Sequence, residues 1–124
     1  MKKKSSGQPV GCAIYARSAS VEQSYEDKSV LRQVRKCKRF AKKNGWIIKN
    51  GCIFTDSAVS GLVVNSGLKL LMRIAAANLK PFDVLICTSI DRIARDTGLA
   101  IRIHKTLKQC GVEIHFAELD DKPL

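Results

Sequence analysis

The side chains best suited to chemistry lie in two polar clusters, each directly after a short apolar segment of strand length. The members of the first cluster are Arg17, Ser18, Ser20, Glu22 and Gln23, and those of the second are Asp91, Arg92, Arg95 and Asp96. An arginine guanidinium is planar, permanently charged and able to donate paired hydrogen bonds, so three of them brought together would bind phosphate oxygens. For any one arginine taken alone, a solvated surface charge or a partner of Asp91 or Asp96 is the favoured interpretation.

The spacing of the glycines, cysteines and histidines in the sequence argues against several other kinds of catalytic site. The glycine patterns that bind dinucleotides or nucleotide phosphates, G-x-G-x-x-G and G-x-x-x-x-G-K-[ST], do not occur in the sequence. The intervals from Cys12 to Arg17 and from Cys87 to Arg92 are one residue too short for the phosphate cradle of a cysteine phosphatase. The two histidines have no third ligand at metal-binding spacing, and a Ser-His-Asp triad would need a nucleophile elbow that the sequence lacks. We therefore expect no metal and no cofactor.

Composition limits the partners and the compartment. A chain of 124 residues that is 45% hydrophobic and 27% charged has room for one globular domain with one core. Its formal net charge of +11 suggests a polyanionic partner, with nucleic acid first, although a basic tail and a solvated helix face could also carry the excess. No apolar run approaches the roughly 20 residues of a membrane span, and the basic start lacks the apolar core of a secretory signal. The five dispersed cysteines are best read as buried thiols in a reducing compartment, so we expect a cytoplasmic protein.

Strand-like and helix-like segments alternate along the chain. After a basic arm over residues 1–9, strands are predicted over 10–15, 46–54, 83–87 and 112–116, and helices over 29–43, 68–79 and 99–110. Asn44–Gly45 ends the first helix, Asn50–Gly51 puts a bend in the second strand, and residues 55–66 form a loop. This order predicts an α/β domain with a mostly parallel sheet of four to five strands and helices on both faces. Because functional residues gather beyond the carboxyl ends of parallel strands, both polar clusters should lie at one edge.

Several motifs in the two clusters and between them resemble those of serine site-specific recombinases, the resolvase/invertase family. The segment from Tyr15 to Gln23 resembles Y-x-R-x-S-[ST]-x-x-Q, and the segment from Asp91 to Arg95 resembles D-R-[LI]-x-R. Weaker matches follow the family's order and are Ser29–Gln33 (S-[IL]-x-x-Q), Asp56 with Ser60–Gly61 (D-x-x-x-S-G) and Asn65–Leu68 (R-x-G-L). The resemblance covers residues 10 to 118.

The resemblance implies a catalytic domain that acts on DNA without metal or ATP. In the family a serine hydroxyl attacks a phosphodiester, a 5′-phosphoserine link forms, and strands are exchanged and resealed in a tetramer. By motif, Arg17, Arg92 and Arg95 would bind the phosphate and Asp91 would be the acid/base or orienting carboxylate. The supporting polar residues would be Gln23, Gln33, Asp56 and Ser60.

This chain departs from the family pattern at two positions. Ala19 occupies the nucleophile position, and alanine has no oxygen to form the ester, so the chain as written should not cleave DNA. Ser18 and Ser20 flank this position but point the opposite way in an extended segment. Asn65 replaces the arginine of R-x-G-L. An engineered Ser-to-Ala change and a natural degenerate copy both explain Ala19.

The family resemblance also sets expectations for organisation and assembly. Residues 10–124 correspond to the catalytic domain, and the family's dimerisation helix and DNA-binding module are expected to be absent from this chain. The full-length form would act as a homodimer or tetramer on DNA in a prokaryotic cytoplasm, with this chain a monomer or weak dimer. The alternatives are a non-catalytic basic DNA-binding or regulatory module that retains the recombinase fold, and a flavodoxin-like or receiver domain. The latter would favour acids where Arg17 stands.

Overall fold

The computed structural model describes residues 9–18, 28–56, 58–59, 62–63, 66–77, 79–89, 92–93 and 97–120. The predicted arm therefore lies almost wholly outside the described residues. The strands are β1 (Gly11–Arg17), β2 (Ile47–Asp56), β3 (Ala58–Val59), β4 (Leu62–Val63), β5 (Val84–Cys87) and β6 (Glu113–Phe116). The helices are α2 (Lys28–Lys43), α3 (Ser66–Ala75), α4 (Thr97–Gln109) and α5 (Ala117–Asp120).

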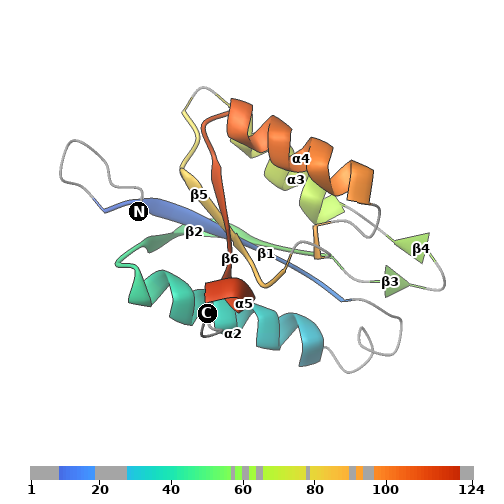
Figure 1. Cartoon of the computed structure of the whole chain (residues 1–124), viewed down its shortest axis with the longest axis horizontal. Coiled ribbons are helices and arrows are strands. Elements are labelled where there is room, and N and C mark those ends of the chain that lie inside the picture. Colours follow the sequence, from blue (N-terminus) through green and yellow to red (C-terminus); the bar gives the residue numbers. More distant parts are fainter. Residues whose placement is uncertain are drawn as a thin grey trace.

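Four strands form one parallel sheet in the order β2-β1-β5-β6, which confirms the predicted fold class (Figure 1). β1 lies in the interior of this sheet, between β2 and β5, and every one of its residues is buried. A strand buried on both faces reads as a continuous apolar run, which is why the sequence of β1 shows no alternation. The first strand of the chain is therefore at the centre of the sheet, and its carboxyl end leads to the first polar cluster.

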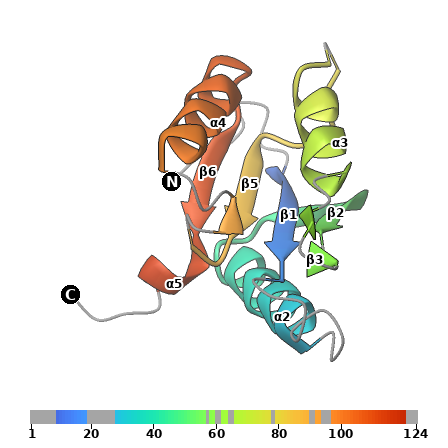
Figure 2. The same ribbon diagram turned by 90° about the vertical axis from the view of Figure 1, so that its right-hand side faces the viewer.

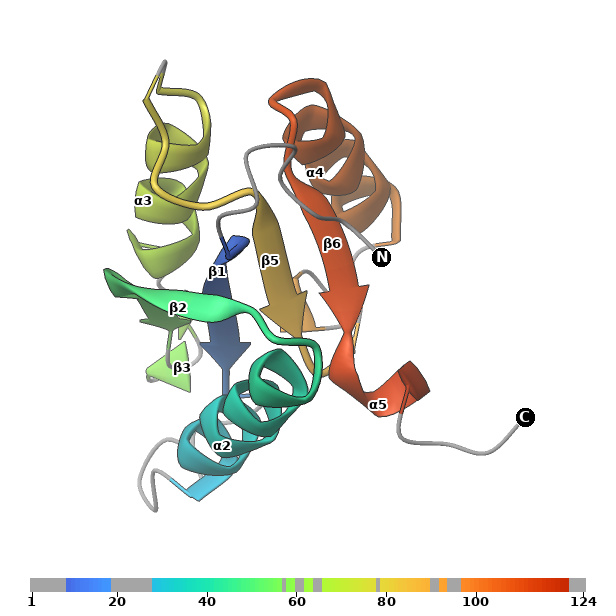
Figure 3. The same cartoon turned by 90° about the vertical axis from the view of Figure 1, so that its left-hand side faces the viewer.

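Helices cover both faces of the sheet (Figures 2 and 3). On one face, Cys12 and Ile14 of β1 pack with Cys37 and Phe40 of α2. The alternate residues of β1 pack in a second cluster on the opposite face, where α3 and α4 contribute the apolar side chains Leu68, Leu71, Ala75, Ala100, Ile103 and Leu107. Successive side chains of a strand point to opposite faces, so one short strand organises both layers of the core.

The predicted bend in the second strand is a real irregularity of β2. Cys12 pairs with Ile48, whereas Ile14 pairs with Ile53, so β2 bulges away from β1 between these positions. Gly51 within the bulge has a φ of 77°, a conformation that glycine adopts without steric cost. The bulge resets the pairing so that the last residue of β1 lies beside Asp56, the last residue of β2.

The structure differs from the sequence prediction at two short elements. Ala58–Val59 and Leu62–Val63 pair as an antiparallel hairpin within the predicted loop over residues 55–66. A four-residue helix, α5, follows β6 where no element was predicted. Elements of two and four residues are too short to produce a hydrophobic period, so the sequence pattern carries no signal for them.

Candidate active site

Arg17, a predicted phosphate-binding residue, ends the central strand and is held by helix α2. Its backbone N–H donates a hydrogen bond to Oε1 of Gln33 over 3.2 Å, and Nε2 of Gln33 donates to its carbonyl oxygen over 2.8 Å. Both residues are buried, with exposed fractions of 7% and 6%. The buried amide of Gln33 thus replaces the strand partners that the main chain of Arg17 would otherwise need, and it fixes where β1 ends.

Arg92 reaches the same point from the loop after β5. Its Nη1 donates a hydrogen bond over 3.3 Å to the carbonyl oxygen of Arg17, a residue 75 positions earlier in the chain. The backbone N–H of Arg92 bonds the carbonyl of Ser89 over 3.1 Å, which closes a turn directly beyond the strand. The structure therefore brings Arg92 to the end of β1, as the carboxyl-edge argument predicted.

Asp56 lies beside Arg17 at the end of β2 and makes three hydrogen bonds to protein groups. Its Oδ2 accepts from the hydroxyl of Tyr15 over 2.6 Å and from the N–H of Leu68 over 2.9 Å, and its Oδ1 accepts from the N–H of Gly67 over 2.8 Å. The two N–H groups belong to the first turn of α3, where a carboxylate satisfies unpaired donors and interacts favourably with the helix dipole. Asp56 is 4% exposed, so its oxygens act inside the protein as a support of the site.

Tyr15 is the neutral partner of this buried carboxylate. Burial raises the pKa of the Tyr15 hydroxyl well above its usual range, and the hydrogen bond and the negative charge of Asp56 raise it further. The positive charge of Arg17 opposes this rise in the pKa. The phenol therefore stays protonated and remains a hydrogen-bond donor at every physiological pH.

The remaining predicted site residues lie outside the described part of the chain. These are Ala19, Gln23, Ser60, Asp91 and Arg95. Their roles stay predictions, because the described residues fix only the ends of the segments that carry them. Arg17 and Ser18 lead directly into residue 19, and Arg92 directly follows residue 91.

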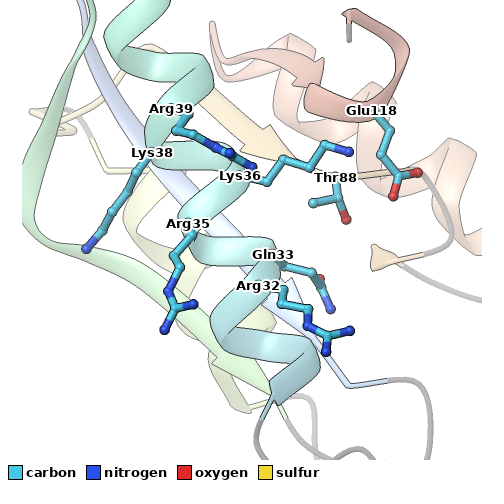
Figure 4. Close-up of a pocket in the computed structure, with 8 residues that line it drawn as sticks. All are labelled: Arg32, Gln33, Arg35, Lys36, Lys38, Arg39, Thr88 and Glu118. Carbon is cyan, nitrogen blue, oxygen red and sulfur yellow. The ribbon is translucent and has the colours of Figure 1, made fainter. Parts of the chain in front are cut away.

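A basic hollow borders this edge of the sheet (Figure 4). It has a volume of about 680 Å³, and its wall includes Gln33, which holds Arg17, and Thr88, which follows β5. Most of the other lining residues are Lys and Arg side chains of α2. The motifs in the sequence assign no role to the basic residues of this helix or to Tyr15. A tyrosine in a wholly buried strand was an available signal, because a buried phenol needs a hydrogen-bond partner.

No group of three or more His, Cys, Asp and Glu side chains within the described ranges could hold a metal ion. None of the described helices is long and apolar enough to cross a membrane.

Comparison with known proteins identifies the family. The family model described as resolvase, N-terminal domain, matches residues 12–123. No curated protein matches the sequence significantly.

The solved structures that share the fold include three from recombinases and integrases. A resolvase family site-specific recombinase from Streptococcus pneumoniae has a TM-score of 0.77 at 18% identity, over 88% of this chain and 72% of that one. The C-terminal catalytic domain of ISC1926 TnpA, an IS607-like serine recombinase, has a TM-score of 0.70 at 22% identity, over 93% and 71%. The N-terminal catalytic domain of TP901-1 integrase has a TM-score of 0.69 at 18% identity, over 88% and 78%. The match to the family model, together with the fold, confirms the resemblance seen in the motifs, and the chain belongs to the resolvase family of serine recombinases.

Proposed function

We propose that this chain is a recombinase catalytic domain that binds a DNA phosphodiester between Arg17 and Arg92 and, with Ala19 at the nucleophile position, cannot cleave it. The observation that carries the proposal is the hydrogen bond from the Arg92 guanidinium to the main chain of Arg17. It joins the two motifs that are most specific to the family at the carboxyl edge of the sheet, where parallel α/β domains place their ligands.

The chemistry needs positive charge placed where negative charge develops. When a serine hydroxyl attacks the phosphorus, it gives up its proton, a Ser Oγ–P bond forms, the P–O3′ bond breaks, and the leaving 3′ oxygen takes up a proton. Arginines stabilise the crowded, more negative transition state. Asp91 is proposed to act as the acid or base in the proton transfer, or as the carboxylate that orients the reacting groups. One phosphate ester replaces another, so the exchange needs no external energy source. Alanine offers no oxygen, so the chain as written would bind the phosphate and stop there.

The finer proposals concern assembly and compartment. We propose that the protein acts on DNA and that strand exchange, as in the family, takes place in a homodimer or tetramer. A prokaryotic cytoplasm fits both the family and the absence of a membrane-spanning helix among the described residues.

Restoring the nucleophile tests the proposal directly. Ala19→Ser should form a covalent protein–DNA adduct once the chain is joined to a sequence-specific DNA-binding module and given DNA that carries that module's sites. The adduct is measured as a shifted band on a denaturing gel, and phosphoserine is then identified by mass spectrometry. The unaltered Ala19 chain, joined to the same module, is the matched control and should give no adduct.

A second variant ties the adduct to the proposed site. Adding Arg92→Gln to Ala19→Ser should reduce the rate of adduct formation by about 100-fold or more, because one preorganised donor to the transition state is lost. An adduct that forms equally fast without Arg92 would contradict the proposed role of this residue.

One observation favours a second function. Ala19 itself is the expected residue in a module that has kept the fold for DNA binding or regulation and has given up catalysis. That reading predicts no adduct from Ala19→Ser, even when the fusion protein binds its DNA sites normally.

A further inference from the structure

We propose that the exposed side of α2 is a second DNA contact, which binds the phosphate backbone next to the active site without reading sequence. This surface, called the α2 basic face below, consists of Arg32, Arg35, Lys36, Lys38, Arg39, Lys42 and Lys43. The proposal rests on the proposed function only in taking DNA as the substrate. It concerns residues that have no part in phosphoryl transfer.

The charge pattern of α2 is the first argument. The helix contains no Asp or Glu. Its basic residues recur at spacings of three and four, where an acidic partner could otherwise pair with them. Arg35 is followed by Arg39 and Lys38 by Lys42, and like charges four residues apart on a helix repel each other. Within the described part of the chain, no carboxylate pairs with Arg35, Lys38 or Arg39. Among the described residues the helix therefore carries a repulsion that a bound polyanion would relieve.

The shape of the surface is the second argument. The hollow of about 680 Å³ is lined by Arg32, Arg35, Lys36, Lys38 and Arg39, and a second hollow of about 240 Å³ continues past Arg39 to Lys43. Figure 4 shows Arg32 and Lys36 on the side of α2 that faces Thr88, and Arg35 and Lys38 projecting from the other side of the helix. Among the described residues of the lining, Glu118 is the one acid, and the Lys36 side chain points toward it.

The position of the surface is the third argument. Arg32 precedes Gln33, whose side chain holds the main chain of Arg17, so the basic face begins at the predicted phosphate site. From Arg32 to Lys43 the helix advances about 16 Å, at 1.5 Å per residue. One DNA strand presents about five phosphates over that distance, at 3.4 Å of helix axis each. A duplex whose scissile phosphate lies at Arg17 can therefore continue along α2 without a gap in positive charge.

The helix is also held firmly enough to act as a docking surface. Its opposite side buries Cys37, Phe40 and Ala41 against the sheet, with exposed fractions of 5% or less. Removing exposed cations therefore changes the charge of the surface and leaves its packing intact.

Two triple variants of equal charge test the proposal. The first, Arg35→Gln/Lys38→Gln/Arg39→Gln, removes three cations from the α2 basic face. The second, Arg102→Gln/Lys105→Gln/Lys108→Gln, removes three exposed cations from α4 on the other face of the sheet and is the matched control. The 124-residue chain is titrated with a labelled mixed-sequence duplex at several salt concentrations, and thermal unfolding shows that each variant is folded.

The expected result is specific to α2. Each phosphate contact contributes about −0.9 to the slope of log affinity against log salt, so the first variant should lose about 2.7 from that slope. The affinity change between 50 and 200 mM salt should then shrink by about 40-fold, while the control keeps the slope of the unaltered chain. Equal losses in both variants would mean that net charge alone governs binding, and this result would overturn the proposal.

Lysine footprinting supplies a measurement on the unaltered chain. Bound duplex should protect Lys38, Lys42 and Lys43 from acetylation and leave Lys105 and Lys108 reactive. If polyglutamate protects the same lysines more strongly than the duplex does, the partner is an acidic polypeptide and the proposal is wrong. Failure of either test leaves adduct formation by Ala19→Ser unaffected, so failure of this inference is distinguishable from failure of the proposed function.

Discussion

The carboxylate of Asp56 connects three parts of the molecule through hydrogen bonds to Tyr15, Gly67 and Leu68. The phenol of Tyr15 comes from the central strand, and the two N–H groups come from the start of α3. A buried carboxylate is stable only when its oxygens are hydrogen-bonded, so each donor is needed to keep the charge inside the protein. Asp56 consequently fixes the start of α3 relative to the strand that ends in Arg17.

Removing the phenol tests this connection. Tyr15→Phe should lower the free energy of unfolding by about 1.5–3 kcal/mol at pH 7, because a hydrogen bond to a buried charged group is lost. Urea unfolding measures the change, and Tyr25→Phe, which removes the other phenol of the chain, is the control. Unchanged stability of Tyr15→Phe would contradict the proposed support by Asp56.

The contribution of Tyr15 to the free energy of unfolding should decrease at high pH. The pKa of Tyr15 is raised in the folded state, so above about pH 10 the unfolded chain loses a proton that the folded chain keeps. The stability gained from this phenol is fully present below that pH and declines as the pH rises further. The difference between the unaltered chain and Tyr15→Phe should therefore narrow in urea titrations at pH 10.5.

At the residue scale, the sequence predicted the meeting of Arg17 and Arg92 but gave no sign of the bond between Tyr15 and Asp56. The first follows from topology, because both residues come just after parallel strands. The second depends on the bulge of β2, which sets which residues of β2 lie beside the end of β1. Strand register is decided by tertiary packing, so motif spacing could not reveal it.

At the scale of elements, α3 begins in unusually close contact with the end of β2. A Cβ atom at Gly67 would lie 2.5 Å from the carbonyl oxygen of Thr55 and 3.1 Å from Oδ1 of Asp56. Both neighbours belong to the strand end, and they could give way only if α3 moved. Glycine is therefore required at position 67, because any larger side chain would clash with the end of β2. The family motif R-x-G-L also has glycine at this position.

Gly67→Ala should lower the free energy of unfolding by about 1–3 kcal/mol through this overpacking. Ser66→Ala, one position earlier on an exposed side chain, is the matched control and should change stability far less. Urea unfolding compares the two variants with the unaltered chain. Similar stability of both would show that the start of α3 can move away from β2 at little cost.

The elements that the sequence predicted well are those with a strong local cause. β1 and β5 are wholly buried and stand out as apolar runs, and Asn44–Gly45 ends α2 where predicted. The hairpin of β3 and β4 and the short α5 are too brief to show a hydrophobic period, and α5 is in addition tied to a distant part of the chain. Glu118 of α5, for example, donates its backbone N–H to the carbonyl of Thr88, which no local pattern could indicate.

At the scale of the whole molecule, the reactivity of the cysteine thiols indicates how tightly the two layers of the core are packed. All five are free thiols, and the first four along the chain are buried. Burial raises the pKa of Cys12 to about 11 and that of Cys37 to about 12, and it also raises the pKa values of Cys52 and Cys87. A raised pKa leaves less of the reactive thiolate at neutral pH.

Iodoacetamide at pH 8 should therefore modify Cys110 first, because it is only partly buried. The other four thiols should react only after the chain is unfolded in urea, and peptide mass spectrometry distinguishes the sites. Rapid modification of Cys12 or Cys37 in the native chain would show that the core opens far more readily than this packing implies.

The central place of β1 has a consequence for the order in which the sheet can form. β1 needs β2 on one side and β5 on the other, and the carbonyl of Arg17 accepts a hydrogen bond from a residue 75 positions later in the chain. Contacts this far apart along the chain form late, after the intervening loops have closed. The central strand therefore cannot obtain both of its strand partners, nor Arg17 its contact with Arg92, until β5 and the turn after it have been synthesised.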